Sequence, residues 1–218
     1  MSGGGAAIAV IDYGMGNLRS VWQALVHVAG EQEVIVTSDP DMVRSADRVV
    51  FPGQGAMPDC MRELEARGLR AAVLDAAANK PFLGICIGLQ MLFEHSEEGD
   101  VPGLGIFQGS VRRFPAERMK TSAGARLKVP HMGWNELLQQ QQQQHPLWQG
   151  IEDGARFYFV HSYYVDPVDR ESVAGTTHYG LPFTSAIARD NIFATQCHPE
   201  KSARVGLALL ANFVRWAP

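Results

Sequence analysis

The chain contains the sequence PFLGICIGLQ at residues 81–90, and this stretch decides the predicted fold. A short apolar run after a proline indicates a buried strand, and the apolar pattern at 89–93 predicts a helix directly after it. Cys86 then lies at a strand-to-helix elbow, where the backbone is strained and Gly84 and Gly88 leave it room. A free cysteine is usually a small buried apolar residue, but the first turn of a helix favours a thiolate. Cys86 is therefore a candidate nucleophile that still needs a base.

Length and composition indicate an ordinary globular protein. The 218 residues fit one α/β domain, and a hydrophobic content of 46% with 19% charged residues is typical of soluble proteins. The formal charge of −4 argues against a nucleic-acid binder. Three cysteines without a CxxC pair indicate neither a disulfide framework nor a zinc site. The start lacks a signal-peptide pattern and no 18-residue apolar run occurs, so we expect no membrane association and a cytoplasmic location.

Strands and helices alternate along the chain, which predicts an α/β fold. We expect a single domain over residues 1–218, built on an open, mostly parallel sheet that is flanked by helices and has an antiparallel extension. Besides the strand before Cys86, strands are expected at 6–11, 34–36, 49–51, 157–165, 185–189 and 192–196. Helices are expected between Asn17 and Gly30, around 64–74, and from Ser202 to Trp216, with Asn17 and Ser202 as N-caps.

The remaining segments are predicted to be less regular. Residues 94–100 are acidic and polar, which favours an exit loop after the helix that follows Cys86. The segment 105–127 is typical of irregular or antiparallel structure. The glutamine tract at 139–144 offers no core-forming side chains and is expected to be an exposed loop, and residues 1–5 are expected to be flexible.

Glycines also follow the strand at 49–51, where the sequence continues Pro52-Gly53-Gln54-Gly55. Such a stretch at the carboxyl edge of a parallel sheet can expose backbone N–H groups to a ligand. Alone, it would be only a strand-to-helix turn. Because a candidate nucleophile ends the next strand, a contribution to an oxyanion hole is the better interpretation.

The base that Cys86 needs is predicted at His198. Pro199 restricts His198 to an extended conformation, and the Glu200 carboxylate can accept one ring N–H, which leaves the other nitrogen for the thiol. Strand alternation sends the neighbouring Cys197 to the opposite face, which makes it a poor nucleophile. The cysteines and histidines show no metal-ligand spacing, so no metal is expected.

These elements together resemble a known family. Gly84-x-Cys86-x-Gly88 with His198-Pro199-Glu200 resembles the class I glutamine amidotransferases, which carry a Cys-His-Glu triad. Other stretches resemble more narrowly the glutaminase subunits of imidazole glycerol phosphate synthase, and the match runs from Ile8 to the last helix. Those stretches are PGQG at 52–55, PHMGWN at 130–135, FVHSY at 159–163 and HPEKS at 198–202.

The resemblance implies a mechanism that needs no cofactor. The Cys86 thiolate attacks the side-chain carboxamide of glutamine and forms a thioester through an oxyanion. His198 takes the thiol proton and gives it to the departing ammonia, while Glu200 orients His198. Water then releases glutamate.

The resemblance also implies roles for further residues. The oxyanion would be bound by backbone N–H groups of Gly53, Gln54 and Ile87. Substrate contacts would come from Gly55, Gln90, Glu98, Ser162 and Tyr163. A partner would be contacted by Asn17, Trp134, Tyr158 and Lys201, although Trp134 and Tyr158 could instead be core aromatics. Gln54 departs from the small aliphatic residue common at its position, which a backbone role tolerates.

The partner implied by the resemblance is a cyclase subunit on a separate chain. A (β/α)₈ barrel alone needs about 250 residues, so the ammonia must be used elsewhere. We expect a heterodimer in which the cyclase receives ammonia by a sequestered route and makes imidazole glycerol phosphate and AICAR in L-histidine biosynthesis. Low activity of the lone subunit, with coupling between the two sites, is a further expectation.

Three alternatives stay open. The chain could be the glutaminase of an anthranilate or aminodeoxychorismate type synthase, although the stretch HMGWN at 131–135 speaks against that. It could be a catalytically silent binding subunit, although the triad is complete. It could also be a thiol hydrolase on a similar scaffold, which would hydrolyse peptides but not free glutamine.

Overall fold

A computed structural model describes residues 7–121, 123–140 and 145–218. Within this part of the chain, twelve strands form one sheet and two further strands pair separately. The segment 1–5 and residues 141–144 of the glutamine tract lie outside the described residues. No helix among the described residues is long and apolar enough to cross a membrane.

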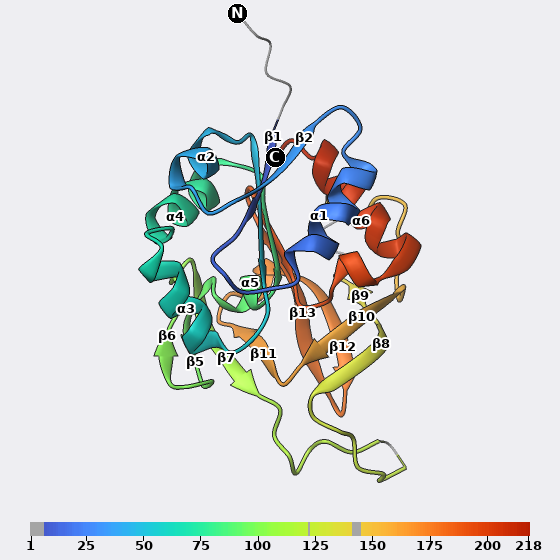
Figure 1. Ribbon diagram of the computed structural model, residues 1–218. Helices are drawn as coiled ribbons and strands as arrows, with labels where there is room; N and C mark the ends of the chain where they lie inside the picture. Colours follow the sequence, from blue (N-terminus) through green and yellow to red (C-terminus); the bar gives the residue numbers. More distant parts are fainter. Residues whose placement is uncertain (1–6, 122, 141–144) are drawn as a thin grey trace, which may run out of the picture.

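One half of the large sheet is parallel and covered by helices. Its strands are, in spatial order, β2 (Glu33–Thr37), β1 (Ala7–Ile11), β3 (Arg48–Gly53), β4 (Phe82–Cys86) and β14 (Ile192–Thr195). The helices are α1 (Leu18–Val28), α2 (Pro40–Ser45), α3 (Met57–Ala66), α4 (Arg70–Asn79), α5 (Ile87–Gln90) and α6 (Ala203–Arg215). Figure 1 shows α1 and α6 on one face of these strands and α2, α3 and α4 on the other. Strands buried on both faces are nearly continuous apolar runs, as β1 and β4 are.

The other half of the sheet is largely antiparallel. It continues from β14 through β13 (Leu181–Arg189), β11 (Tyr163–Pro167), β7 (Phe107–Arg113), β5 (Phe93–Ser96) and β6 (Val101–Pro102). β12 (Val173–Tyr179) and β9 (Leu138–Gln139) extend it beside β13. The separate pair is β8 (His131–Glu136) with β10 (Arg156–His161). Single 3-10 turns are η1 (Pro146–Trp148), η2 (Arg170–Ser172) and η3 (Pro199–Lys201). The predicted open sheet with helices and an antiparallel extension is confirmed.

The helix predicted after Cys86 is wrong in its length. α5 has only four residues, and the apolar residues that follow enter β5 instead. Phe93 is fully buried there and stacks on Phe107 with ring centroids 5.9 Å apart. The predicted exit loop at 94–100 is wrong over 94–96 for the same reason, because β5 continues to Ser96, whereas 97–100 form a turn.

The strand predicted at 157–165 is two strands that belong to different sheets. β10 ends at His161 and pairs with β8, whereas β11 begins at Tyr163 and pairs with β7 and β13. The chain changes sheets at Ser162. The glutamine tract also begins as ordered structure rather than as an exposed loop. Gln139 belongs to β9 and donates to the Ile151 carbonyl at 2.9 Å.

Both predicted N-caps stand at the right positions but do not cap. The Asn17 amide donates to the Ser20 hydroxyl at 2.8 Å. The Ser202 hydroxyl donates to the His198 carbonyl at 2.6 Å and accepts the Tyr158 N–H at 3.0 Å. Ser202 therefore links β10 to the His198 backbone through two hydrogen bonds, instead of capping the helix.

Candidate active site

Cys86 occupies a strained position between β4 and α5. Its φ is +57° and its ψ is −109°, a conformation that few non-glycine residues adopt. A Cβ on Gly88 would lie 1.8 Å from the Phe51 carbonyl oxygen, and one on Gly84 would lie 2.8 Å from the Ala194 Cβ. The two glycines thus let the elbow pack against the neighbouring strands β3 and β14. The predicted elbow is present. Because α5 has only four residues, its summed peptide dipole is small and favours a thiolate only weakly.

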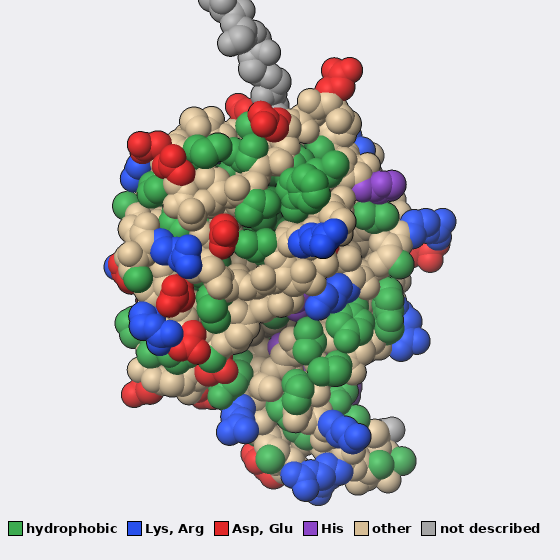
Figure 2. Space-filling view, viewed as in Figure 1, with side chains coloured by type: hydrophobic (Ala, Val, Ile, Leu, Met, Phe, Trp, Pro, Cys, Tyr) green, Lys and Arg blue, Asp and Glu red, His purple; other side chains and the backbone are tan. Residues whose placement is uncertain are grey.

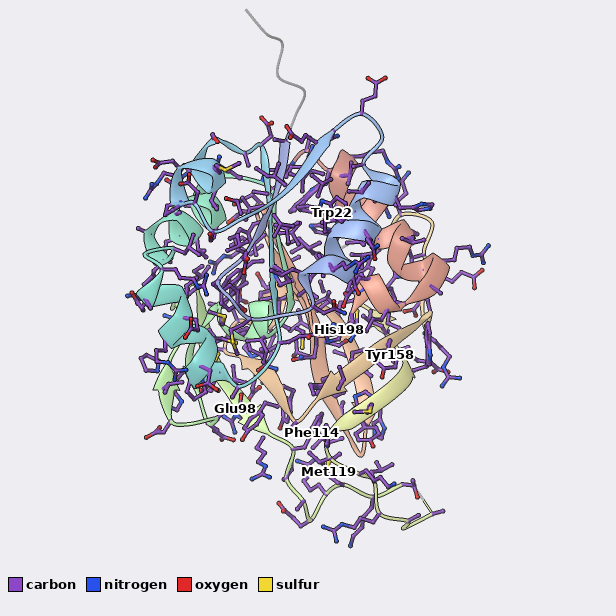
Figure 3. All side chains as sticks on the ribbon, viewed as in Figure 1. Trp22, Glu98, Phe114, Met119, Tyr158 and His198 are labelled. Atoms are coloured by element: carbon purple, nitrogen blue, oxygen red, sulfur yellow. The ribbon has the colours of Figure 1, made fainter. Side chains whose placement is uncertain are left out.

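His198, directly before η3, and Glu200, on η3, form a buried pair shortly after the end of β14. His198 Nδ1 lies 2.8 Å from Glu200 Oε1, and their side chains are 2% and 1% exposed. The backbone N–H of His198 donates to the Tyr158 carbonyl at 2.8 Å. Figure 3 shows His198 beside Tyr158 at the lower end of the strands. This anchoring holds the ring with Nδ1 toward the carboxylate and leaves Nε2 buried, without a hydrogen-bond partner among the described residues.

Charge at this site favours a protonated His198. Burial opposes a charged imidazole, but the interactions with Cys86, and after them those with Glu200, outweigh burial and raise the pKa of His198 to about 10. An imidazolium and a thiolate stabilise each other at such a site.

The other two cysteines lack these conditions. Cys197 is fully buried, with its sulfur 2.9 Å from the Thr195 hydroxyl, and burial raises the pKa of its thiol far above the usual range. Burial also raises the pKa of Cys60 to about 11, and its thiol donates to the Gln54 carbonyl at 3.5 Å. Neither lines the cavity that Cys86 lines. Their surroundings suit structural cysteines.

A cavity of about 410 Å³ opens above Cys86. Its volume suits a small ligand. It brings together Cys86, His198, Ile87, Gln54 and all five predicted substrate residues, while Gly53 pairs in register with Cys86 on the neighbouring strand. The full lining is Gln54, Gly55, Cys86, Ile87, Gln90, Glu98, Pro130, Val160, His161, Ser162, Tyr163, His198 and Lys201. A larger open groove of about 1270 Å³ shares Pro130 with it, and no cysteine is among the described residues that line this groove.

Polar contacts fix the walls of the cavity. Gln90 Nε2 donates to the Tyr163 carbonyl at 3.2 Å and to Gln196 Oε1 at 3.0 Å, whereas Gln90 Oε1 is buried without a partner among the described residues. Glu98 Oε2 accepts the Met57 N–H at 2.8 Å, at the start of α3. Gln90 therefore keeps a buried acceptor, without a partner among the described residues, in the wall of the cavity.

Two groups at this site were not predicted from the sequence. Gln196 Nε2 contacts the Cys86 sulfur at 3.6 Å and links it to Gln90. His161 lines the cavity and is hydrogen-bonded to the buried His131. Gln196 stands directly before Cys197 and His198, and both histidines stand in the stretches that carried the resemblance. Their positions could have drawn attention, but their contacts depend on strand pairing.

The predicted partner residues lie around one side of the site. Trp134 is 46% exposed and its ring meets that of half-buried Tyr158 edge-on, with centroids 6.1 Å apart. Trp134 is thus not a core aromatic. Lys201 lines the cavity of Cys86, and Asn17 lies beside His198 and Glu200. Figure 2 shows hydrophobic side chains gathered over β8 and β10. Met132 on β8 and Leu138 on β9 are also exposed.

The buried histidines predict how stability depends on pH. Burial lowers the pKa of His131 to about 4 and that of His161 to about 3. Both pKa values lie below the value of about 6.5 for histidine in the unfolded chain. The folded protein therefore has its full free energy of unfolding, as far as these histidines affect it, above about pH 6.5, and loses part of it as the pH falls toward 4. Between about pH 6 and 5 we expect these two residues to lower the free energy of unfolding by up to about 2.7 kcal/mol. Urea unfolding at several pH values measures this slope.

A matched pair of variants tests the origin of that slope. The slope of the free energy of unfolding against pH reflects the number of protons taken up on unfolding, and His131→Phe should lower that number by about one. His27→Gln, at an exposed position on α1, should leave the slope unchanged. A slope that His131→Phe does not alter would contradict the prediction.

Comparisons with known proteins agree over nearly the whole chain. The sequence model of the family "Glutamine amidotransferase class-I" matches residues 9–216. A protein of Dechloromonas aromatica named imidazole glycerol phosphate synthase subunit HisH is 69% identical over 214 residues, which cover 98% of each chain. One of the same name from Aromatoleum aromaticum is 66% identical and covers 97% of this chain and 99% of the relative.

Solved structures show the same fold at low sequence identity. The structure of PurLQS from Thermotoga maritima aligns with a TM-score of 0.70 at 17% identity, covering 97% of this chain and 98% of the other. A crystal structure of a glutamine amidotransferase aligns with a TM-score of 0.69 at 16% identity, covering 95% of this chain and 97% of the other. At such identity the likeness concerns the fold alone.

Proposed function

Because the chain belongs to the class-I glutamine amidotransferases, and within them to the family of the imidazole glycerol phosphate synthase subunit HisH, we propose that Cys86, His198 and Glu200 release ammonia from L-glutamine for a separate cyclase subunit. The observation that carries the proposal is the cavity in which Cys86, at a strained elbow, meets the buried His198–Glu200 pair. The product of the cyclase, imidazole glycerol phosphate, belongs to L-histidine biosynthesis.

The first half of the reaction forms a thioester. The Cys86 thiolate attacks the side-chain carbonyl carbon of glutamine, and the carbonyl oxygen becomes an oxyanion. His198 then donates its Nε2 proton to the departing nitrogen, so that the C–N bond breaks and ammonia leaves. Glu200 keeps the ring oriented and supports its positive charge through Nδ1. Water next attacks the thioester, His198 takes a proton from it, and glutamate leaves as the thiolate returns.

Backbone N–H groups on two sides of the elbow are proposed to bind the oxyanion. Ile87 follows Cys86 directly, and Gly53 pairs in register with Cys86 at the end of β3, so that Gln54 comes next to the elbow. The Cys60 thiol holds the Gln54 carbonyl, which limits rotation of the following peptide. Only backbone is used, so the unusual Gln54 side chain is compatible with this role.

The amino-acid end of glutamine is proposed to bind at the opposite wall. Gln90 Oε1 is a buried acceptor without a partner among the described residues, and Glu98 adds a carboxylate to the same cavity. Both suit an α-ammonium group. Gly55, Ser162 and Tyr163 supply backbone along this wall. A buried polar group that only the right ligand can satisfy contributes strongly to specificity.

The partner is proposed to be the cyclase subunit, bound as a heterodimer over β8. Met132, Trp134 and Leu138, on β8 and the adjoining β9, are 62%, 46% and 45% exposed, and an exposed apolar group of this kind is typical of an interaction surface. Tyr158, Lys201 and Asn17 would complete the interface. The three cysteines are free and buried, which suits the reducing cytoplasm in which we propose the heterodimer acts.

Ammonia release from glutamine tests the proposal. We expect slow release by the purified chain and strong stimulation by a cyclase subunit that carries its nucleotide ligand. Trp134→Ala should weaken cyclase binding about 30-fold, the effect of losing an interfacial tryptophan worth about 2 kcal/mol. Trp22→Ala, on α1 and 37% exposed, is the matched control and should bind normally.

The outcomes separate the parts of the proposal. Full activity without stimulation by the cyclase would keep the glutaminase and discard the partner, which would favour another synthase. Peptide hydrolysis without glutamine hydrolysis would instead favour a thiol hydrolase. A chain that binds the cyclase but releases no ammonia under any condition would be a silent subunit.

A further inference from the structure

A chain of hydrogen bonds runs through the interior from β8 to the rim of the Cys86 cavity. Asn135 Nδ2 lies 3.3 Å from His131 Nε2, His131 Nδ1 lies 2.9 Å from His161 Nε2, and His161 Nδ1 lies 2.8 Å from the Tyr163 carbonyl. The two histidines are only 3% and 6% exposed. Nothing in the glutaminase reaction described above uses this chain.

The positions of its protons follow from the last acceptor. A carbonyl oxygen can only accept, so His161 Nδ1 must carry a hydrogen. Burial lowers the pKa of both histidines, to about 3 for His161 and about 4 for His131, so each ring is neutral and has a single N–H. His161 Nε2 must then accept from His131 Nδ1, and His131 Nε2 must accept from Asn135. All four ring nitrogens are satisfied and the direction of every bond is fixed.

The Tyr163 carbonyl is where this chain reaches the cavity. It accepts from His161 and also from Gln90 Nε2 at 3.2 Å. Tyr163 is the first residue of β11, and Ser162 before it lies between β10 and β11, where its carbonyl accepts the Phe114 N–H at 3.1 Å. Tyr163 itself pairs in register with Arg113 of β7, and the two side-chain donors hold its carbonyl in addition to this pairing. Tyr163 and Gln90 both line the cavity.

We propose that His131 and His161 are positioning residues of the glutamine site. The hydrogen bonds from β8 hold the Tyr163 carbonyl, and with it Gln90 and the backbone of Ser162, in the geometry that binds the amino-acid end of glutamine. His131 does not line the cavity and acts through His161. The inference rests on the proposed function, because glutamine is the ligand whose binding is affected.

Aromatic packing is the competing role for His131. Its ring stacks on Tyr179 with centroids 4.0 Å apart and on Phe159 with centroids 5.0 Å apart. Two substitutions separate packing from hydrogen bonding. His131→Phe keeps an aromatic ring but removes the donor to His161. His131→Asn loses the ring but keeps an N–H group near the position of Nδ1.

Steady-state kinetics in the complex with the cyclase give the decisive comparison. We expect His131→Phe to raise KM for glutamine about tenfold, the equivalent of one hydrogen bond to a buried group, with kcat nearly unchanged. His131→Asn should keep KM close to that of the unaltered protein. Alkylation of Cys86 by iodoacetamide should proceed at the same rate in all three proteins, because that reaction does not involve the amino-acid site.

Several results would overturn the inference. An unchanged KM in His131→Phe would do so, as would an increase in His131→Asn equal to or larger than that in His131→Phe, because packing would then account for the effect. Failure of the proposed function is recognised separately, since the unaltered protein would then release no ammonia from glutamine.

Nitrogen NMR of the unaltered protein tests the same inference if either variant fails to fold. With ¹⁵N-labelled histidine at pH 7, His131 and His161 should both be neutral and carry the proton on Nδ1. This tautomer is required by the Tyr163 carbonyl. A proton on Nε2 of either ring, or an imidazolium at this pH, would show that the hydrogen bonds do not run from β8 to the cavity.

Discussion

Cys86→Ala is expected to lower kcat for ammonia release from glutamine by about 10⁶-fold, the scale of losing the nucleophile of a catalytic triad. Alanine removes the sulfur that is proposed to form the thioester, and it leaves the proposed oxyanion donors and substrate contacts in place. The elbow itself should persist, because alanine has the same Cβ as cysteine and meets the same backbone strain at φ +57°. Glutamine binding should therefore survive while turnover is lost, and calorimetry of the variant with glutamine can measure that binding.

Cys197→Ala is the matched control for this experiment. Cys197 is also a buried free cysteine near the site, only one residue from His198, but its sulfur is bound to the Thr195 hydroxyl and lies outside the cavity. The control should keep most of its turnover. Iodoacetamide should modify the unaltered protein and the Cys197 variant but not the Cys86 variant. If Cys86→Ala kept substantial activity, the mechanism built on this elbow would be wrong.

The strained elbow at Cys86 could be predicted from sequence because its constraints are local. A strained residue at a turn needs small neighbours. Gly84 and Gly88 lie two residues before and after Cys86, so this requirement is visible in the local sequence. The structure adds a second reason that sequence could not supply. Each glycine also faces a neighbouring strand, with the Phe51 carbonyl against Gly88 and Ala194 against Gly84. The two glycines were correctly predicted to leave room for a strained Cys86. They are also required because the neighbouring strands pack closely against them.

The errors in the predicted fold have a common physical origin. In residues 89–96 the apolar pattern satisfies a helix at first and a strand afterwards, and tertiary contacts decide where one gives way to the other. Phe93 goes to the strand because Phe107 stacks on it. Likewise the aromatic run at 157–165 gives no sign of its break at Ser162, because both halves are strands. The break exists because each half pairs with different partners.

Residues that act through distant partners were the hardest to predict. Gln196 meets Cys86 and Gln90 only because β14 lies beside β4. His131 and His161 meet because β8 pairs with β10 in a register that sets them opposite each other. Single histidines in strands are usually interpreted as core or surface residues, and only the pairing turns these two into a connected pair. The resemblance to a family indicated the proposed triad and the residues that line the cavity, but it implied no role for this pair of histidines.

The second large effect is expected from Glu200→Gln, which should lower kcat about 10²-fold, the low end of what general acid–base catalysis supplies. Glutamine keeps the shape of the side chain and can still accept the His198 Nδ1 hydrogen. It removes the negative charge that, after Cys86, helps to raise the pKa of His198. That pKa should therefore fall, and less imidazolium will be present to protonate the departing ammonia. The amide that replaces the buried, unpartnered Oε2 adds an unsatisfied donor, which should cost about 1–3 kcal/mol of stability.

Glu98→Gln makes the same chemical change at the other end of the cavity and is the matched control. Glu98 contacts the start of α3 and faces the proposed amino-acid site rather than His198. It should raise KM for glutamine with little effect on the rate at which iodoacetamide alkylates Cys86. Glu200→Gln should slow that alkylation at pH 7. A smaller fraction of His198 is then protonated, and less positive charge remains to stabilise a thiolate at Cys86. Equal alkylation rates in the two variants would show that Glu200 only orients the ring, and that the charge on His198 depends on Cys86 alone.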